Sequence, residues 1–150
     1  MDRFEDFYIV RVPRDGNCLF SSLTTQLLST RYWCSEHVEF TKCLRKDACK
    51  YIQENLEMYR VSIIESAREK WPELSDEDQL INLFLNDLSL DGTWGGEEIL
   101  QATSSIYNIR IEVYQIGIPP IVLEYFILII IIMRVYTIQT FLIPLRFIVQ

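Results

Sequence analysis

Cys18 follows a glycine and an asparagine at the start of an apolar repeat, where its thiol is placed to act as a nucleophile. Gly16 and Asn17 both tolerate the backbone angles of a sharp turn. Apolar residues then recur at helical spacing, which predicts a helix over about 18–28 with Cys18 in its first turn. Because a helix N-terminus favours negative charge, we expect the pKa of the Cys18 thiol to be lowered.

The chain enters this turn from a predicted strand over 8–12. The backbone N–H groups of the turn, around Gly16, Asn17 and Cys18, are donors of the kind that hold a developing oxyanion. The turn therefore combines a candidate nucleophile with candidate oxyanion donors.

The motif Asp-Gly-Asn-Cys-Leu-Phe at 15–20 resembles the active-site motif of the ovarian-tumour (OTU) family of cysteine proteases, most of which are deubiquitinases. Residues 94–102 and 109–114 are similar to the Trp-Gly, helix and strand segment of that family. Residues 44–55 look like its second helix. The resemblance covers roughly residues 5–115, with the blocks in the family's order.

The resemblance implies an α/β (α+β) fold of papain-like architecture, with helices packed on a small central sheet and atypical C-terminal strands. It implies hydrolysis of ubiquitin isopeptide bonds, with ubiquitin or ubiquitinated proteins as partners and no cofactor. By the same resemblance Cys18 is the nucleophile, Asp15 is the acidic member of the triad, and the amides of Gly16 and Asn17 contribute to the oxyanion hole.

The family's general base is a histidine on a strand after 109–114, and this sequence has no histidine there. A cysteine protease needs that imidazole as base and then as acid. The single histidine is His37. The helix predicted over about 18–28 lies between Cys18 and His37, and its length takes the chain roughly 15 Å away from Cys18. We therefore interpret His37 as an exposed or capping residue. Without an imidazole to orient, Asp15 has the alternative role of a turn-forming residue.

Two functions follow from this missing group. The first is an OTU-type cysteine deubiquitinase that is impaired in this chain. The alternative is a catalytically dead OTU pseudoenzyme, or a module that binds ubiquitin or another partner without turnover.

The composition restricts the classes of partner and the cellular compartment that we expect. A net charge of −7 and a pI near 4.7 argue against a nucleic-acid partner. Four cysteines without a Cys-x-x-Cys pair, together with one histidine, predict no metal site. The charged N-terminus lacks a secretory signal, so we expect a cytoplasmic or nuclear protein with reduced thiols. Cys34, Cys43 and Cys49 are interpreted as ordinary buried or half-buried residues.

Apolar periodicity predicts helices over about 38–56 and 58–71, a fourth that begins with a capping box at Ser75, and a fifth from the Gly95–Gly96 turn through residue 106. Alternation predicts a half-buried strand at 109–114. We interpret Trp94 as an anchor of its loop to the core, with a substrate-side wall as the alternative.

The charge distribution predicts a boundary near residue 115. Residues 1–115 carry 12 Lys/Arg and 20 Asp/Glu, whereas residues 116–150 carry two arginines and one glutamate. We predict an OTU-like domain at 1–115, incomplete because it lacks the late histidine, and an Ile-rich apolar tail at 116–150.

Three interpretations of this tail remain open. It contains β-forming runs at 121–123, 127–133 and 135–138, which the resemblance requires as strands. A membrane anchor is less favoured, because Glu124 and Arg134 bracket a stretch shorter than the about 20 apolar residues of a span. The third interpretation is translated AT-rich non-coding sequence from a retained intron or a frameshift.

Overall fold

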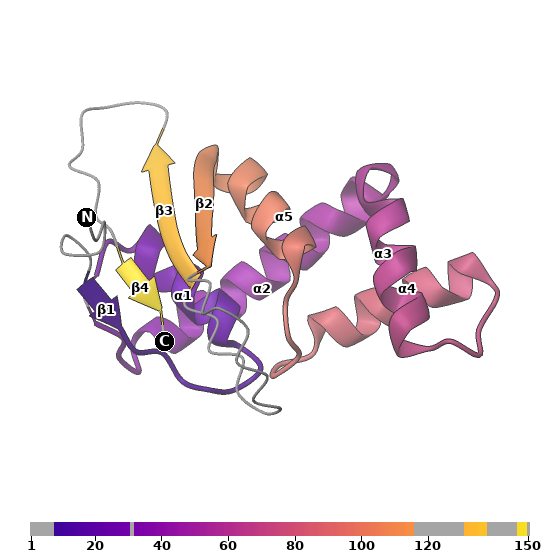
Figure 1. Cartoon of the computed structure of the whole chain (residues 1–150), viewed down its shortest axis with the longest axis horizontal. Coiled ribbons are helices and arrows are strands. Elements are labelled where there is room, and N and C mark those ends of the chain that lie inside the picture. Colours follow the sequence, from indigo (N-terminus) through magenta and orange to yellow (C-terminus); the bar gives the residue numbers. More distant parts are fainter. Residues whose placement is uncertain (1–7, 31, 116–130, 138–146, 150) are drawn as a thin grey trace.

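The computed structural model describes residues 8–30, 32–115, 131–137 and 147–149. Figure 1 shows the strands at one end of the molecule and the α3–α4 pair at the other, with α2 running between them. The elements in chain order are β1 (Tyr8–Val10), α1 (Cys18–Leu27), α2 (His37–Glu54), α3 (Leu56–Lys70), α4 (Glu77–Ser89), α5 (Glu97–Tyr107), β2 (Ile109–Gln115), β3 (Ile131–Thr137) and β4 (Phe147–Val149).

The five predicted helices are confirmed, and their ends differ from the prediction by only a few residues. The second helix ends at Glu54, earlier than expected, and the backbone leaves the helical conformation at Asn55, whose φ and ψ are −120° and 34°. The side-chain amide of Asn55 donates to the carbonyl of Tyr51 at 2.9 Å. The cap of α4 is Asp76 rather than Ser75. Its Oδ1 accepts from the backbone N–H of Gln79 at 2.7 Å, which satisfies a donor of the first turn.

One apolar core joins the helices. Along α2 the side chains of Leu44, Ala48 and Ile52 are fully inaccessible, and they pack against residues of the other four helices. The largest buried side chains of those four helices are Phe20, Leu23, Tyr59, Ile63, Leu80 and Ile99. This burial is the main force that fixes the helices relative to one another.

The four strands form one sheet in the order β1-β4-β3-β2. β2 pairs antiparallel with β3, so that Ile111 lies opposite Val135, and β3 pairs antiparallel with β4. β1 pairs in parallel with β4. Strand β3 overlaps two of the predicted β-forming runs, whereas the run at 121–123 lies outside the described residues.

Within the described part of the chain, no helix has the length and apolarity needed to cross a membrane. Most of the segment on which the anchor interpretation depends lies outside that part.

Candidate active site around Cys18

Cys18 is the first residue of α1 and its side chain is half-buried. The turn before it is closed by Asp15, whose carbonyl accepts from the backbone N–H of Cys18 at 3.2 Å. The side-chain Oδ1 of Asp15 accepts from the backbone N–H of Asn17 at 2.9 Å. Asp15 itself is exposed, and these contacts are those of a turn-forming aspartate.

The same contacts occupy two of the backbone N–H groups that were predicted as oxyanion donors. The N–H groups of Asn17 and Cys18 already donate to Asp15, so an oxyanion at this turn would have to compete for them or share them. The roles of Gly16 and Asn17 as oxyanion donors, and of Asp15 as a triad member, stay predictions.

The predicted direction of the Cys18 pKa is wrong. Burial raises the pKa of the Cys18 thiol above its ordinary value, and this is the largest effect on it. A hydrogen bond from the backbone of Leu19 lowers that pKa, the charge of Asp15 raises it, and the backbone N–H of Cys18 lowers it. The amides at the helix start therefore act as expected, but desolvation of the thiolate outweighs them.

A second loop packs directly against this turn. The backbone of Gly92 approaches Gly16 so closely that a Cβ at Gly16 would overlap the Gly92 carbonyl. Gly92 has a φ of +83°, which suits glycine, and its N–H donates to Asn17 Oδ1 at 3.1 Å. The site therefore combines the Cys18 turn with the loop between α4 and α5.

Arg45 on α2 connects these two loops. Its side chain is 4% exposed and donates to the Asn17 side chain and to backbone carbonyls of both loops. Sequence reasoning missed this residue. A signal was present, because Arg45 stands four residues from Thr41 and from Cys49, and all three share the buried face of α2.

His37 lies away from Cys18. Eight residues of α2 separate it from Arg45, about 12 Å at 1.5 Å per residue, and it is Arg45 that contacts the Cys18 turn. The interpretation of His37 as exposed is wrong, because it is 6% exposed and packs against the rings of Tyr32 and Trp33. Its Nδ1 has no hydrogen-bond partner among the described residues.

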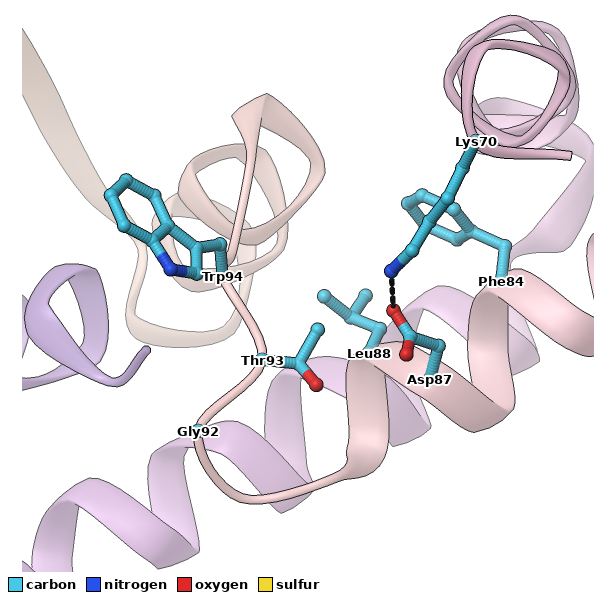
Figure 2. Close-up of a pocket in the computed structure, with 7 residues that line it drawn as sticks. All are labelled: Lys70, Phe84, Asp87, Leu88, Gly92, Thr93 and Trp94. Carbon is cyan, nitrogen blue, oxygen red and sulfur yellow. Dashed lines mark hydrogen bonds and ion pairs between the residues drawn. The ribbon is translucent and has the colours of Figure 1, made fainter. Parts of the chain in front are cut away.

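A cavity of about 490 Å³ lies beside the α4–α5 loop. Figure 2 shows Trp94 on one side and the ion pair between Lys70 and Asp87 on the other, with Leu88 and Thr93 between them. Trp94 is 74% exposed, so its interpretation as a core anchor is wrong.

The α4–α5 loop is anchored by its backbone instead. A Cβ at Gly95 would lie 3.1 Å from side-chain atoms of Leu19, Phe20 and Ile99, which shows how closely the backbone approaches the core there. This close packing leaves the Trp94 ring on the surface, where it forms one wall of the cavity.

The other cysteines are free thiols in the described residues, and no group of three or more His, Cys, Asp or Glu side chains there is arranged to hold a metal ion. Cys34 is half-buried and Cys49 is buried, as interpreted, whereas Cys43 is exposed. Cys43 lies on the face of α2 that points away from the core, directly after Lys42 and three residues before Lys46.

Comparison with known proteins agrees with the motif. The model of the family described as "OTU-like cysteine protease" matches residues 13–128. The chain therefore belongs to the OTU-like cysteine protease family, whose named members include deubiquitinating enzymes.

Two relatives carry names from this family. "OVARIAN TUMOR DOMAIN-containing deubiquitinating enzyme 10" of Arabidopsis thaliana is 30% identical over 108 residues, which are 72% of this chain and 24% of that protein. "Putative ubiquitin thioesterase 232R" of Invertebrate iridescent virus 3 is 29% identical over 104 residues, 69% of this chain and 11% of that protein. The chain thus spans a quarter or less of these relatives' length.

Among solved structures, the OTU domain of OTUD1 aligns with 94% of this chain and 73% of its own, with a TM-score of 0.47 and 17% identity.

Proposed function

We propose that this chain binds ubiquitin or ubiquitinated proteins at an OTU-type site centred on Cys18, and that its hydrolysis of ubiquitin conjugates is impaired. The observation that carries the proposal is the position of Cys18 at the start of α1, in a turn held by Asp15 and by the α4–α5 loop. Membership of the OTU-like family supports the substrate class.

The proton transfers that hydrolysis requires explain why we expect it to be impaired. The sulfur of Cys18 would attack the carbonyl carbon of the ubiquitin C-terminus, the amine would leave, and water would later cleave the thioester. The thiol proton needs an acceptor and the leaving amine needs a donor, which a histidine supplies in cysteine proteases. Among the described residues the next strand after β2 is β3, with the sequence IIMRVYT, and it contains no histidine.

The proposal extends to the architecture. Residues 1–115 would form the OTU-like domain, with the helices packed on a small sheet in papain-like fashion. Residues 116–150 would supply strands that depart from the family's pattern. The paired backbones of β2, β3 and β4 support this assignment of the strands.

The alternative function is a pseudoenzyme that binds ubiquitin without turnover. The raised pKa of the Cys18 thiol favours it, because a protonated thiol is a weak nucleophile near neutral pH. The two functions share the binding site and differ only in the fate of the bound carbonyl.

A ubiquitin derivative with an electrophilic C-terminus tests the site without requiring a general acid. We expect a covalent adduct that peptide mapping places on Cys18, that forms faster as the pH rises, and that is absent from Cys18→Ala. Cys43→Ala is the matched control, because Cys43 is an exposed thiol on another helix. Adducts on Cys34 or Cys43 instead, or equal labelling in Cys18→Ala, would refute the site. Saturable ubiquitin binding without any adduct would establish the binding module.

A further inference from the structure

Arg45 has contacts that exceed what a surface arginine makes. Its Nη1 donates to the carbonyl of Leu88 at 2.7 Å, at the end of α4. Its Nη2 donates to the carbonyl of Thr93 at 2.6 Å and to Asn17 Oδ1 at 2.7 Å, with the Gly16 carbonyl at 3.4 Å. One guanidinium thus connects α2, the end of α4, the α4–α5 loop and the Cys18 turn.

These contacts lie on both sides of Cys18. Asn17, directly before it, is held through its side chain by Arg45 and by the N–H of Gly92. Phe20, two residues after it, has its ring 3.9 Å from the guanidinium carbon. A planar cation against an aromatic face is a favourable contact that also limits rotation of both groups. The backbone of Cys18 is therefore fixed from before and after.

Arginine is the residue type that this arrangement requires. Its guanidinium carries five N–H donors in a fixed plane, whereas a lysine ammonium is one point with three donors. The acceptors lie in three separate segments, at the end of α4, in the α4–α5 loop and in the Cys18 turn, and Arg45 is almost fully buried among them. Without these donors the carbonyls of Leu88 and Thr93 would lose a buried partner, and the two loops would lose their common attachment.

We propose that Arg45 is a positioning residue for Cys18, one that holds the turn so that the amides of Leu19 and Cys18 face the sulfur. The proposal rests on the function proposed above, which makes Cys18 the nucleophile. Arg45 touches no reacting atom in this proposal, and it acts through Asn17, Phe20 and the α4–α5 loop.

The test is the pH dependence of Cys18 alkylation by iodoacetamide in the full chain, followed by peptide mapping. The other cysteines serve as controls in the same molecule. Cys43 is exposed on α2, so its labelling rate measures the reactivity of the reagent at each pH. Cys49 is buried one turn after Arg45, so its labelling would show that the variant's core has unfolded. Arg60→Gln is the matched arginine control, since Arg60 pairs with Glu77 and Asp78 at the surface.

In Arg45→Lys, which keeps the charge, we expect the pH–rate profile of Cys18 to move up by about one pH unit, or about tenfold slower labelling at pH 8. Cys43 labelling should be unchanged and Cys49 should stay protected. Asn17→Ala should move the profile in the same direction, and the double variant should move it less than the sum of the two. A Cys18 profile that is unmoved, or that moves down, in folded Arg45→Lys and Asn17→Ala would overturn the proposal.

The ubiquitin probe separates this inference from the proposed function. If the wild-type chain forms no adduct and binds no ubiquitin, but the alkylation profile moves as expected, the proposed function is wrong and the positioning role stands. If the adduct forms on Cys18 at the same rate in Arg45→Lys as in the wild type, with an unmoved profile, the function stands and the positioning role is wrong.

Discussion

At the scale of single residues, opposing effects act on the thiol of Cys18. Its position at a helix start contributes about 0.3–1 kcal/mol in favour of the thiolate, which is less than one unit of pKa. Burial acts in the other direction and is the larger effect, so the pKa of Cys18 is raised above that of an ordinary thiol. A cysteine at a helix N-terminus is therefore not activated by that position alone.

The first prediction concerns the wild-type thiol. We expect the alkylation rate of Cys18 to keep rising beyond pH 9, because burial holds its pKa above that of an ordinary thiol. The reference is a short unfolded peptide of residues 14–22, measured with the same reagent. A midpoint for the folded chain below that of the peptide would show that the helix start dominates after all.

The second prediction concerns Gly16. In Gly16→Ala the new Cβ overlaps the backbone of Gly92, which no side-chain rotation relieves. We expect the free energy of unfolding to fall by about 3 kcal/mol, at the upper end for overpacking. Gly92→Ala is the control, because it has open space and only the strain of a positive φ, about 1–2 kcal/mol. Urea denaturation of both variants decides, and an equal or smaller loss in Gly16→Ala would contradict the close approach.

At the scale of elements, the site is a junction of two loops held by one helix. The Cys18 turn and the α4–α5 loop are 75 residues apart at the contact between Asn17 and Gly92. Both attach to α2 through Arg45, and α1 is fixed to α2 further along by the 3.0 Å contact between the hydroxyls of Thr24 and Thr41. Thr24 contacts Thr41 while the Cys18 end contacts Arg45, so the two helices run antiparallel and His37 lies beyond the Thr41 end.

The third prediction concerns the α4–α5 loop. Because Trp94 is exposed at the rim of the cavity beside the α4–α5 loop, we expect Trp94→Ala to change the free energy of unfolding by less than about 0.5 kcal/mol. We expect it to weaken ubiquitin binding about tenfold, since exposed tryptophans that bind partners contribute 1–2 kcal/mol or more. Calorimetric titration and urea denaturation measure the two effects.

Leu88→Ala is the contrasting variant. Leu88 lines the same cavity but is buried, so its truncation should cost about 2–5 kcal/mol of stability. A Trp94→Ala variant that loses stability in this range, or that binds ubiquitin unchanged, would contradict the assignment of Trp94 to a substrate-side wall.

How much of the fold and of the site could be predicted depends on how far apart in the sequence the interacting residues are. Local periodicity placed the five helices, because the apolar faces that define them are local in sequence. The role of Arg45 depends on carbonyls up to 48 residues away, and no local pattern encodes them. The exposure of Trp94 and the burial of the Cys18 thiol depend on tertiary packing rather than on local sequence, so both were missed.

At the scale of the whole molecule, several partly or fully buried groups resist losing a proton. Burial raises the pKa of Cys18, Cys49, Tyr59 and Tyr107 in the folded chain. Above about pH 8.5, the ordinary pKa of a thiol, the unfolded chain loses protons that the folded chain retains. The unfolded state then binds fewer protons, so the free energy of unfolding falls as the pH rises.

The fourth prediction follows from this linkage. We expect the stability of the wild-type chain to decline from about pH 8.5 upward, first through the cysteines and then, near pH 10, through the tyrosines. Cys49→Ala should flatten the decline between about pH 8.5 and 10, whatever its effect on stability at neutral pH. Urea midpoints at a series of pH values provide the measurement. A stability that is constant or rises across this range would contradict the burial of these groups.

We propose that the chain keeps an OTU-type site around Cys18 but lacks the histidine imidazole that fast hydrolysis of ubiquitin conjugates requires. Cleavage of a fluorogenic ubiquitin substrate tests it most directly, with a catalytically intact OTU domain measured in parallel. We expect turnover slower than that of the intact domain by about 10²–10⁴-fold, the usual contribution of general acid–base catalysis. Any residual rate should vanish in Cys18→Ala and persist in His37→Ala. Turnover comparable to the intact domain, lost in both variants, would show that His37 is the base and would contradict the account.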